Sequence, residues 1–356
     1  MEPVSVENVV FGPFGQCLPS LVQGGDRAFA VVDSAVADRF APVLEEFGVE
    51  WMAFRASEDR KSFEGLQEIA GWLLEHEADR GALLLGIGGG VTTDLTGFAA
   101  SVYKRGIRYA LVPTTLLAQV DAAVGGKTGI DFHGCKNVIG TFSMPEAVCV
   151  DTAVLASLPR EELRSGMAEA LKTLVIGDAA MYREAVERMR GGMERLGDNE
   201  LSALVRRCVG IKSGIVAADR TEKGERMKLN LGHTLGHAAE SVCLEAGRPV
   251  THGEAVAAGI IAAAAVSWKK GVLDRSLAES ICNDLKSLGY SDIPGLLSRH
   301  AGLREEEIAP KLSEFVLNDK KRNKDFINFV LIRGLGSVMA EALDVNELQG
   351  IIHDLY

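Results

Sequence analysis

Two histidines stand four residues apart in the stretch LNLGHTLGHAAE, which runs from Leu229 to Glu240. On a helix this spacing places His233 and His237 on one face, one turn apart. Zinc proteases also need a glutamate directly after the first histidine, and Thr234 stands there instead. The pattern therefore leaves three interpretations open: metal ligands, a catalytic pair, or two packed core histidines. Two glycines that are also four apart, Gly232 and Gly236, would let another segment approach on a neighbouring face.

A third histidine and a carboxylate offer the remaining ligands of a metal site. His252 precedes an alanine-rich stretch, and Glu169 and Lys172 stand three apart in GMAEALK. Catalytic zinc takes three protein ligands and keeps one position for substrate or water, and histidine and glutamate both suit it. A surface ion pair is the simpler interpretation of Glu169 and Lys172. However, a carboxylate among small apolar residues is costly to bury, and this favours a function.

A glycine-rich turn, GIGGGVTTD at residues 86–94, follows an apolar run and precedes a helical pattern. Bare backbone at a helix N-terminus suits a nucleotide phosphate, although a tight turn would explain the glycines as well. The dinucleotide pattern G-x-G-x-x-G maps onto Gly88 and Gly90, with Thr93 in the third position. Asp33 ends an early strand pattern, where it can accept ribose hydroxyls or cap a helix.

Further charged and polar residues gather near glycines or just upstream of the histidines. Ammonium and guanidinium groups beside glycine turns suit the binding of an oxyanion, although a lone surface lysine is usually only solvated. These residues are Arg105, Asp121, Lys127, Lys136, Asn137, Lys212, Glu222, Arg226 and Asn230. The helical pattern over 230–246 places Asn230 one turn before His233, so that one helical face would carry both.

Composition limits the classes of partner. The chain of 356 residues carries a net charge of −11, which argues against nucleic acid or an anionic membrane as the main partner. Six scattered cysteines without a C-x-x-C pair are typical of reduced thiols in the cytoplasm. The start of the chain shows no secretory pattern. The longest apolar run, 255–266, is too short to cross a membrane, which needs roughly 20 residues.

The elements that must position these groups fall into two halves. Apolar strand patterns at 27–35, 81–90, 108–115 and 146–151 alternate with helical patterns such as 62–78, which predicts a parallel sheet. Helical periodicity then dominates, with one late strand pattern at 326–332. Its segments are 160–176, 180–196, 199–218, 230–246, 254–271 and 275–288. We therefore expect an α/β domain over residues 1–155 and a mostly α-helical domain over 156–356.

Five stretches appear in the order and spacing of one known family, across about residues 55 to 260. They are GGGVTTDLTGFAASVYKRGIRYALVPTTLLAQVDAAVGGKTGID, GCKNVIGTF, LPREELRSGMAEALK, NLGHTLGHAAE and HGEAVAAG. With them the chain resembles the 3-dehydroquinate synthases of the sugar phosphate cyclase superfamily. The resemblance implies a lyase of the shikimate pathway, which leads to chorismate and the aromatic amino acids. Its substrate would be 3-deoxy-D-arabino-heptulosonate 7-phosphate, and its products 3-dehydroquinate and phosphate.

The same resemblance implies a Rossmann-like domain that binds NAD, a helical domain that binds Zn²⁺ or Co²⁺, and a homodimer. In this reading the metal ligands are Glu169, His233 and His252. The substrate phosphate is held by Lys127, Asn137 and His237, with Arg105 offered by a neighbouring subunit. Lys212 and Arg226 match positions that grip the substrate carboxylate, and Asp121, Lys172, Glu222 and Asn230 match positions around its hydroxyls.

For NAD, the resemblance implies contacts along the glycine-rich turn and in five other segments. These residues are Asp33, Glu58, Lys61, Gly88, Gly89, Gly90, Val91, Thr92, Thr93, Asp94, Thr114, Thr115, Lys127 and Lys136. The sequence departs from the family in two places: Thr93 stands where glycine is frequent, and SEDRKS lacks the glycine that commonly precedes Glu58. A C-terminal lysine of the phosphate site falls on Lys320 or Lys321, in preference to Lys324.

Three other functions stay open. One is another sugar phosphate cyclase, although Lys212 and Arg226 favour a substrate with a carboxylate. Another is a metal-dependent polyol dehydrogenase, which has no need of Lys127, Asn137 and His237 as a phosphate-binding set. The third is an NAD-binding protein without catalysis, which the full set of metal and substrate candidates disfavours.

Overall fold

The computed structural model describes residues 8–22, 27–133, 135–318 and 325–356, and the chain falls into two compact units. Unit 1 comprises Met1–Pro159 and Val205–Gly214, and unit 2 comprises Arg160–Leu204 and Ile215–Tyr356. The boundary expected after residue 155 lies close to the end of the first stretch of unit 1. Helix α7, Asp198–Ala218, contributes its middle part to unit 1 and its ends to unit 2.

Unit 1 is built on a sheet of six parallel strands in the order β1-β8-β5-β4-β2-β3. The strands are β1 Val9–Phe11, β2 Ala28–Asp33, β3 Glu50–Phe54, β4 Leu83–Gly88, β5 Arg108–Pro113 and β8 Ala147–Val150. The parallel sheet predicted from the sequence is confirmed, and all four predicted strands take part. All six residues of β4 are buried, as its continuous apolar run requires of a strand covered on both faces.

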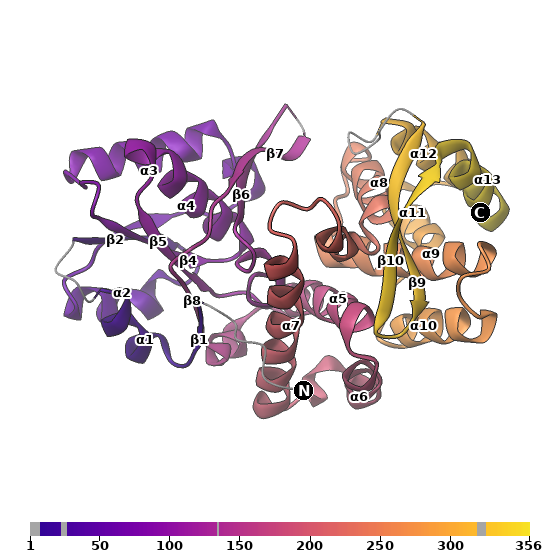
Figure 1. The fold of residues 1–356 in the computed structure, drawn as a ribbon, viewed down its shortest axis with the longest axis horizontal. Coiled ribbons are helices and arrows are strands. Elements are labelled where there is room, and N and C mark those ends of the chain that lie inside the picture. The colour runs from indigo at the N-terminus through magenta and orange to yellow at the C-terminus, as the bar shows by residue number, and fades with distance from the viewer. Residues whose placement is uncertain (1–7, 23–26, 134, 319–324) are drawn as a thin grey trace. The chain divides into compact units, whose positions relative to one another are not determined.

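Helices cover both faces of this sheet (Figure 1). Helices α3 (Phe63–Glu75) and α4 (Gly90–Val102) lie on one face, and α1 (Phe14–Leu21) and α2 (Ala37–Glu46) on the other. The chain steps from β2 to β3 on one side, then crosses to β4 on the other side of β2. Ligands of open α/β sheets bind at such a reversal, at the carboxyl ends of the strands. The ends of β2 and β4 are therefore the natural nucleotide position.

An antiparallel hairpin follows the sheet's central strands, formed by β6 (Lys127–Phe132) and β7 (Cys135–Phe142). It packs on α4, where a Cβ on Gly97 would lie 2.5 Å from the Thr128 side chain. A π-helical turn at Ala118–Ala122 precedes it. The polar and glycine-rich sequence of this region did not predict these strands. They nevertheless carry Lys127, Lys136 and Asn137.

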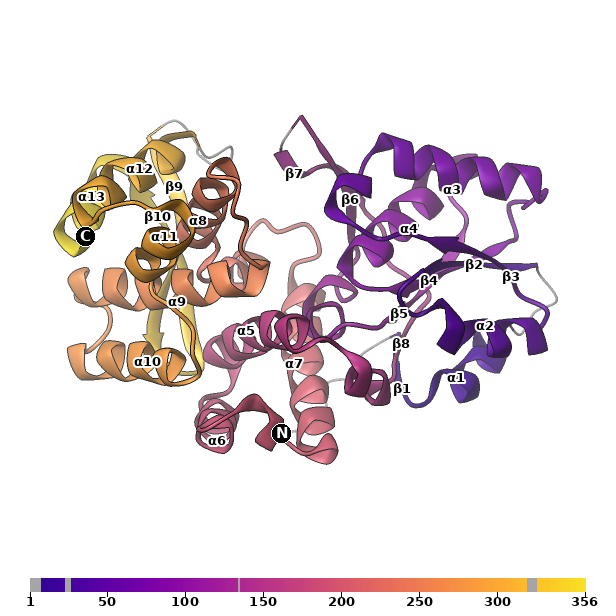
Figure 2. The same ribbon diagram turned by 180° about the vertical axis from the view of Figure 1, so that it is seen from behind.

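Unit 2 is mostly helical, as predicted, with one antiparallel hairpin. Its elements are α5 Arg160–Gly177, α6 Ala179–Met189, α8 His233–Glu245, α9 His252–Lys269, α10 Arg275–Ser287, α11 Ile293–Ala301, α12 Glu305–Asn318, β9 Phe326–Gly334, β10 Ser337–Asp344 and α13 Val345–Leu355. Helix α9 is central and contacts α5, α8, α10 and β9 (Figure 2). The apolar run 255–266 lies buried inside it. Among the described residues, none of the helices has the length and hydropathy needed to cross a bilayer.

Glycines set the distance between α8 and α9. A Cβ on Gly259 would lie 1.9 Å from the carbonyl oxygen of Gly232, and one on Gly236 would lie 2.7 Å from that of Ala255. The close approach predicted at Gly232 and Gly236 is therefore confirmed. However, Gly232 has a φ of +78° and caps α8, which begins only at His233. Asn230 ends a separate 3-10 helix, Glu225–Asn230, so the prediction of one continuous helical face with Asn230 and His233 is wrong.

Candidate active site

The residues expected at NAD lie at the reversal of strand order in unit 1. Asp33 is the last residue of β2, and Gly88 the last of β4. A Cβ on Gly88 would lie 2.9 Å from the Cβ of Asp33 and 2.5 Å from Oγ1 of Thr92, so only glycine fits there. Helix α4 starts at Gly90 with Gly89 as its cap, which leaves bare backbone at its positive end. This geometry suits a pyrophosphate, and Asp33 stands beside it for a ribose.

The other predicted residues of this turn divide by burial. Thr92 and Thr93 are fully buried, and the Thr93 hydroxyl donates to the carbonyl oxygen of Gly90 at 3.0 Å. Their side chains therefore face the protein interior, whereas the side chain of Val91 is half-buried. Thr114 follows β5, and its backbone N–H donates to the carbonyl oxygen of Gly88 at 2.9 Å. Thr115 contacts the same turn, because its methyl group is 3.1 Å from a Cβ built on Gly89.

A buried lysine joins three segments of unit 1. Lys61, which is 5% exposed, donates to Asp94 Oδ2 at 2.6 Å and to Asn137 Oδ1 at 2.5 Å. Burial lowers the pKa of Lys61, but the charge and hydrogen bond of Asp94, together with the charges of Glu58 and Asp131, raise the pKa overall. Lys136 and Glu58 form an exposed pair at 3.5 Å. The structure thus brings Asn137, expected at the substrate phosphate, next to two residues expected at NAD.

The remaining candidates of unit 1 sit on unusual backbone. Asp121 lies in the π-helical turn, and Lys212 donates to both its carboxylate Oδ1, at 2.5 Å, and its carbonyl oxygen, at 2.7 Å. Lys127 follows two glycines with positive φ and is exposed at the start of β6. Arg105 is exposed as well and has a φ of +69°, which is rare for arginine. Such strain often marks a functional position.

The candidate metal ligands lie in unit 2, on three helices. Glu169 of α5 is fully buried, and its Oε1 is 3.2 Å from Nε2 of His252 and 3.8 Å from Nε2 of His233. Burial lowers the pKa of His252, but hydrogen bonding and charge from Glu169 and Glu240 raise it to about 9. These carboxylates therefore favour a positive charge at this position. Buried glutamate and two imidazoles are a suitable donor set for Zn²⁺ or Co²⁺.

His237 gives a second possible ligand set. One ligand atom each from His233, His237 and His252 lies within 4.8 Å of the others. The ring centres of His233 and His237 are 4.9 Å apart, one helical turn along α8. Both the Glu-His-His set predicted from the resemblance and a three-histidine set are therefore compatible with the distances. They share His233 and His252 and differ in whether Glu169 or His237 is the third ligand.

The residues of unit 2 that are expected to bind the substrate hydroxyls and carboxylate lie near these ligands along the chain. Lys172, 1% exposed, lies with Nζ 2.5 Å from Oε2 of Glu169. Asn230 donates to Oε1 of Glu222 at 2.5 Å, and Glu222 has a φ of +59°. Arg226 is buried and donates to the carbonyl oxygen of Arg220 at 2.8 Å. Lys320, Lys321 and Lys324 lie outside the described residues.

Two residues at these sites were not singled out from the sequence. Asp219 accepts hydrogen bonds from the backbone N–H groups of Lys223, Gly224 and Arg226, at 3.1, 2.7 and 3.1 Å. It thereby holds the loop that presents Glu222 and Arg226. Glu240 places Oε2 3.7 Å from Nδ1 of His252. A signal for Glu240 was available, because it follows His237 by three residues and so shares its helical face.

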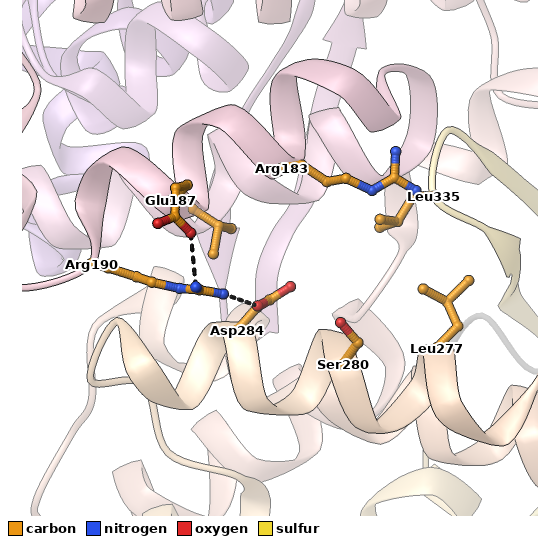
Figure 3. A pocket seen from close by; sticks show the side chains of 8 residues that line it. Arg183, Glu187, Arg190, Leu277, Ser280, Asp284 and Leu335 are labelled. Carbon is orange, nitrogen blue, oxygen red and sulfur yellow. Dashed lines mark hydrogen bonds and ion pairs between the residues drawn. The ribbon is translucent and has the colours of Figure 1, made fainter.

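A surface pocket of about 250 Å³ in unit 2 is separate from these groups. Figure 3 shows its lining by α6, α10 and the turn between β9 and β10, with Arg190 bonded to Glu187 and Asp284. None of the candidate site residues lines it. The pocket is therefore not the candidate active site.

The fold is shared with solved structures of both cyclising synthases and dehydrogenases. A 2-epi-5-epi-valiolone synthase from Streptomyces hygroscopicus superposes with a TM-score of 0.84 at 24% identity, covering 100% of this chain and 98% of that one. A 2-deoxy-scyllo-inosose synthase gives 0.81 at 23%, covering 97% and 96%. A probable glycerol dehydrogenase from Sinorhizobium meliloti gives 0.65 at 17%, covering 98% and 96%.

Sequence comparison identifies the family. Residues 51–165 match the model for the 3-dehydroquinate synthase N-terminal region, and residues 166–322 match that for its C-terminal region. The 3-dehydroquinate synthase of Caulobacter vibrioides is 38% identical over 354 residues, covering 95% of this chain and 92% of the relative. That of Rhodopseudomonas palustris is 36% identical over 342 residues, covering 92% and 87%. The chain belongs to the 3-dehydroquinate synthase family.

Proposed function

We propose that this chain is a lyase that converts 3-deoxy-D-arabino-heptulosonate 7-phosphate to 3-dehydroquinate and phosphate. The observation that carries the proposal is the meeting of Glu169, His233 and His252 from three helices in a chain of this family. NAD would lie at the ends of β2 and β4, and Zn²⁺ or Co²⁺ at Glu169, His233 and His252. The similar synthases of known structure support these cofactors, because their structures contain NAD⁺ with Zn²⁺ or Co²⁺.

NAD held at the ends of β2 and β4 would supply a reversible hydride acceptor, and a metal ion held by Glu169, His233 and His252 would supply polarisation of the hydroxyl that becomes a ketone. The resulting ketone acidifies the neighbouring C–H, so that phosphate leaves by elimination before the hydride returns. Ring opening and an internal aldol closure then form the carbocycle.

The protein's own groups bind and orient the substrate. Lys127, Asn137 and His237 hold the phosphate, and Lys212 and Arg226 the carboxylate. Asp121, Lys172, Glu222 and Asn230 contact the hydroxyls. The ion pairs that these groups form in the structure, such as Lys212 with Asp121, hold their side chains in place.

We further propose a homodimer in which Arg105 reaches the partner's site. The surface around Arg105 supports this arrangement. Ser101 accepts a hydrogen bond from Thr141 at 3.0 Å, so the end of α4 and the end of β7 lie together. Val102 and Phe142, next to these residues, are 43% and 55% exposed. An apolar surface beside a strained, exposed arginine is what an interface that donates this arginine would need. A cytoplasmic location is proposed as well, in keeping with six free thiols.

The test combines metal analysis with a phosphate-release assay on the wild type, His233→Ala and His237→Ala. We expect the wild type to release phosphate without accumulating NADH. His233→Ala should lose the metal, whereas His237→Ala should keep it and lose turnover by about 10²–10³-fold, as for one lost electrostatic contact to the leaving group. The alanine at position 237 removes a ring but leaves Glu169, His233 and His252 in place.

Three results would contradict the proposal in different ways. Steady NADH formation without a cyclised product would indicate a dehydrogenase instead. Turnover of a neutral sugar phosphate in preference to the carboxylate substrate would indicate another sugar phosphate cyclase. Equal loss of metal in both histidine variants would favour the three-histidine ligand set and remove the phosphate role of His237.

A further inference from the structure

His252 has a carboxylate at each of its two ring nitrogens. Nε2 lies 3.2 Å from Oε1 of Glu169, and Nδ1 lies 3.7 Å from Oε2 of Glu240. The side chain of Glu240 is only 10% exposed. Burying a carboxylate costs stability unless it meets donors or a cation, and the imidazole of His252 is one partner that meets this need.

The second histidine of the cluster shows what such a partner does. Nδ1 of His233 lies 3.1 Å from the carbonyl oxygen of Leu231. A carbonyl oxygen only accepts, so Nδ1 carries the proton and Nε2 keeps its lone pair, on the side of Glu169. Histidines that bind a metal through one nitrogen almost always donate through the other to a carbonyl or carboxylate.

We propose that Glu240 is the corresponding partner of His252. In the proposed arrangement its carboxylate closes from 3.7 Å to hydrogen-bond distance and accepts the Nδ1 proton, which fixes the tautomer and turns Nε2 toward the position shared with Glu169 and His233. Glu240 is thus a positioning residue, whereas Glu169 is a ligand, because Oε1 of Glu169 lies within 3.8 Å of Nε2 on both histidines. The inference rests on the metal site of the proposed function and adds a residue to it.

The fold explains how Glu240 comes to this place. It follows His233 by seven residues on α8, close to two full turns, so the two side chains share a face. Helix α9 starts at His252 and runs against this face, where a Cβ on Gly236 would lie 2.7 Å from the carbonyl oxygen of Ala255. The bare backbone of α8 at this crossing lets Glu240 reach the imidazole of the neighbouring helix.

The test measures metal binding to the full-length protein without NAD or substrate. Zn²⁺ and Co²⁺ affinities are measured by competition with a chromophoric chelator for the wild type, Glu240→Met, Glu240→Ala and Glu240→Gln. We expect the Met and Ala variants to bind about 10–100-fold more weakly, since they lack an acceptor. The Gln variant should stay close to the wild type, because its amide oxygen still accepts from Nδ1.

A control on the same helix separates this effect from helix stability. Glu245 ends α8, is 59% exposed and pairs with Lys311 at 3.3 Å. Glu245→Met should bind metal like the wild type. Thermal unfolding of each metal-free variant reports its fold, and the visible spectrum of the Co²⁺-saturated protein reports the ligand set. That spectrum should be the same in the wild type and all Glu240 variants.

Several outcomes would overturn the inference. Wild-type affinity in Glu240→Met and Glu240→Ala would show that Glu240 does not orient His252. An equal loss of metal affinity in Glu240→Gln would show that a hydrogen-bond acceptor at position 240 is not sufficient to orient His252. A changed Co²⁺ spectrum would make Glu240 a ligand. A wild type that binds no metal would instead overturn the proposed metal site, so the two failures are distinguishable.

Discussion

The crossing of α8 and α9 offers a sharp test of how the fold positions the metal site. Gly259 of α9 faces Gly232 of α8, and a Cβ built on Gly259 would lie 1.9 Å from the Gly232 carbonyl oxygen. The contacted atom is backbone, so no side chain can turn away. In Gly259→Ala the helices must separate by about 1.5 Å to reach the 3.4 Å of an ordinary contact.

The expected cost follows from two opposing effects. Alanine in a helix is favoured over glycine by roughly 0.5–1 kcal/mol. Overpacking of a well-packed core costs about 1–3 kcal/mol, and the large shift required here places the cost near the upper end of this range. After the gain from alanine is subtracted, a net loss of about 2 kcal/mol in unfolding free energy is expected. The metal site should suffer more, because His233 and His252 stand on the two helices that move. Metal–ligand distances tolerate only about 0.2 Å, so metal affinity should fall at least about tenfold.

The matched control is Gly350→Ala in α13, also in unit 2. Nothing lies within 4 Å of a Cβ at Gly350, and its φ is not positive. This variant should gain roughly 0.5–1 kcal/mol and keep its metal affinity. Urea unfolding gives the free energies, and chelator competition gives the affinities. If Gly259→Ala matched the wild type in both, the close crossing would not be what places the two histidines, and the reasoning would be refuted.

Two further predictions address the proposed dimer and the residues expected at NAD. Arg105→Ala and His237→Ala should each be strongly impaired alone, but mixing them should restore about a quarter of wild-type activity after subunit exchange. The reason is that half of the dimers are then mixed, and each mixed dimer holds one complete site. No recovery would place Arg105 in the site of its own subunit. Burial raises the pKa of the Asp33 carboxyl above its ordinary value. The affinity for NAD should therefore be full above that raised pKa and fall as the pH drops through it. Asp33→Asn should bind NAD about tenfold more weakly and without this acid limb; an unchanged pH profile by fluorescence titration would exclude the ribose role.

The central strands of unit 1 could be predicted because buried parallel strands leave continuous apolar runs in the sequence. Strands β1 and β3 lie at the edges of the sheet, where burial is partial and the pattern weak. The β6–β7 hairpin was missed for another reason. Five of the eight residues of β7 are exposed, three of them in a row, so no clear alternation marks the strand, and its polar residues resemble those of a loop. The strand character there comes from packing on α4, which is a tertiary effect.

The sequence indicates candidate site residues, but it does not indicate which of them contact one another. Lys61 meets Asn137 across 76 residues, and Lys212 meets Asp121 across 91. Spacing along the chain carries no information about such contacts. The break before His233 was invisible for a local reason, because the helical period continues through Gly232 and only the left-handed backbone there ends it. Asn230 was consequently assigned to the wrong element.

The geometry of the proposed metal site depends on glycines at the crossings of three helices. Each of the three proposed ligands stands within one turn of a helix crossing. His233 follows Gly232, which meets Gly259 of α9, and His252 precedes Gly253, where a Cβ would lie 2.0 Å from the carbonyl oxygen of Ser165. Glu169 is one turn beyond that serine on α5. The crossings of α9 with α8 and with α5 therefore fix the distances among the ligands through backbone contact. A site placed in this way is organised by the packing of unit 2 and not by loops, so small changes at the crossings should affect metal binding before they affect the fold.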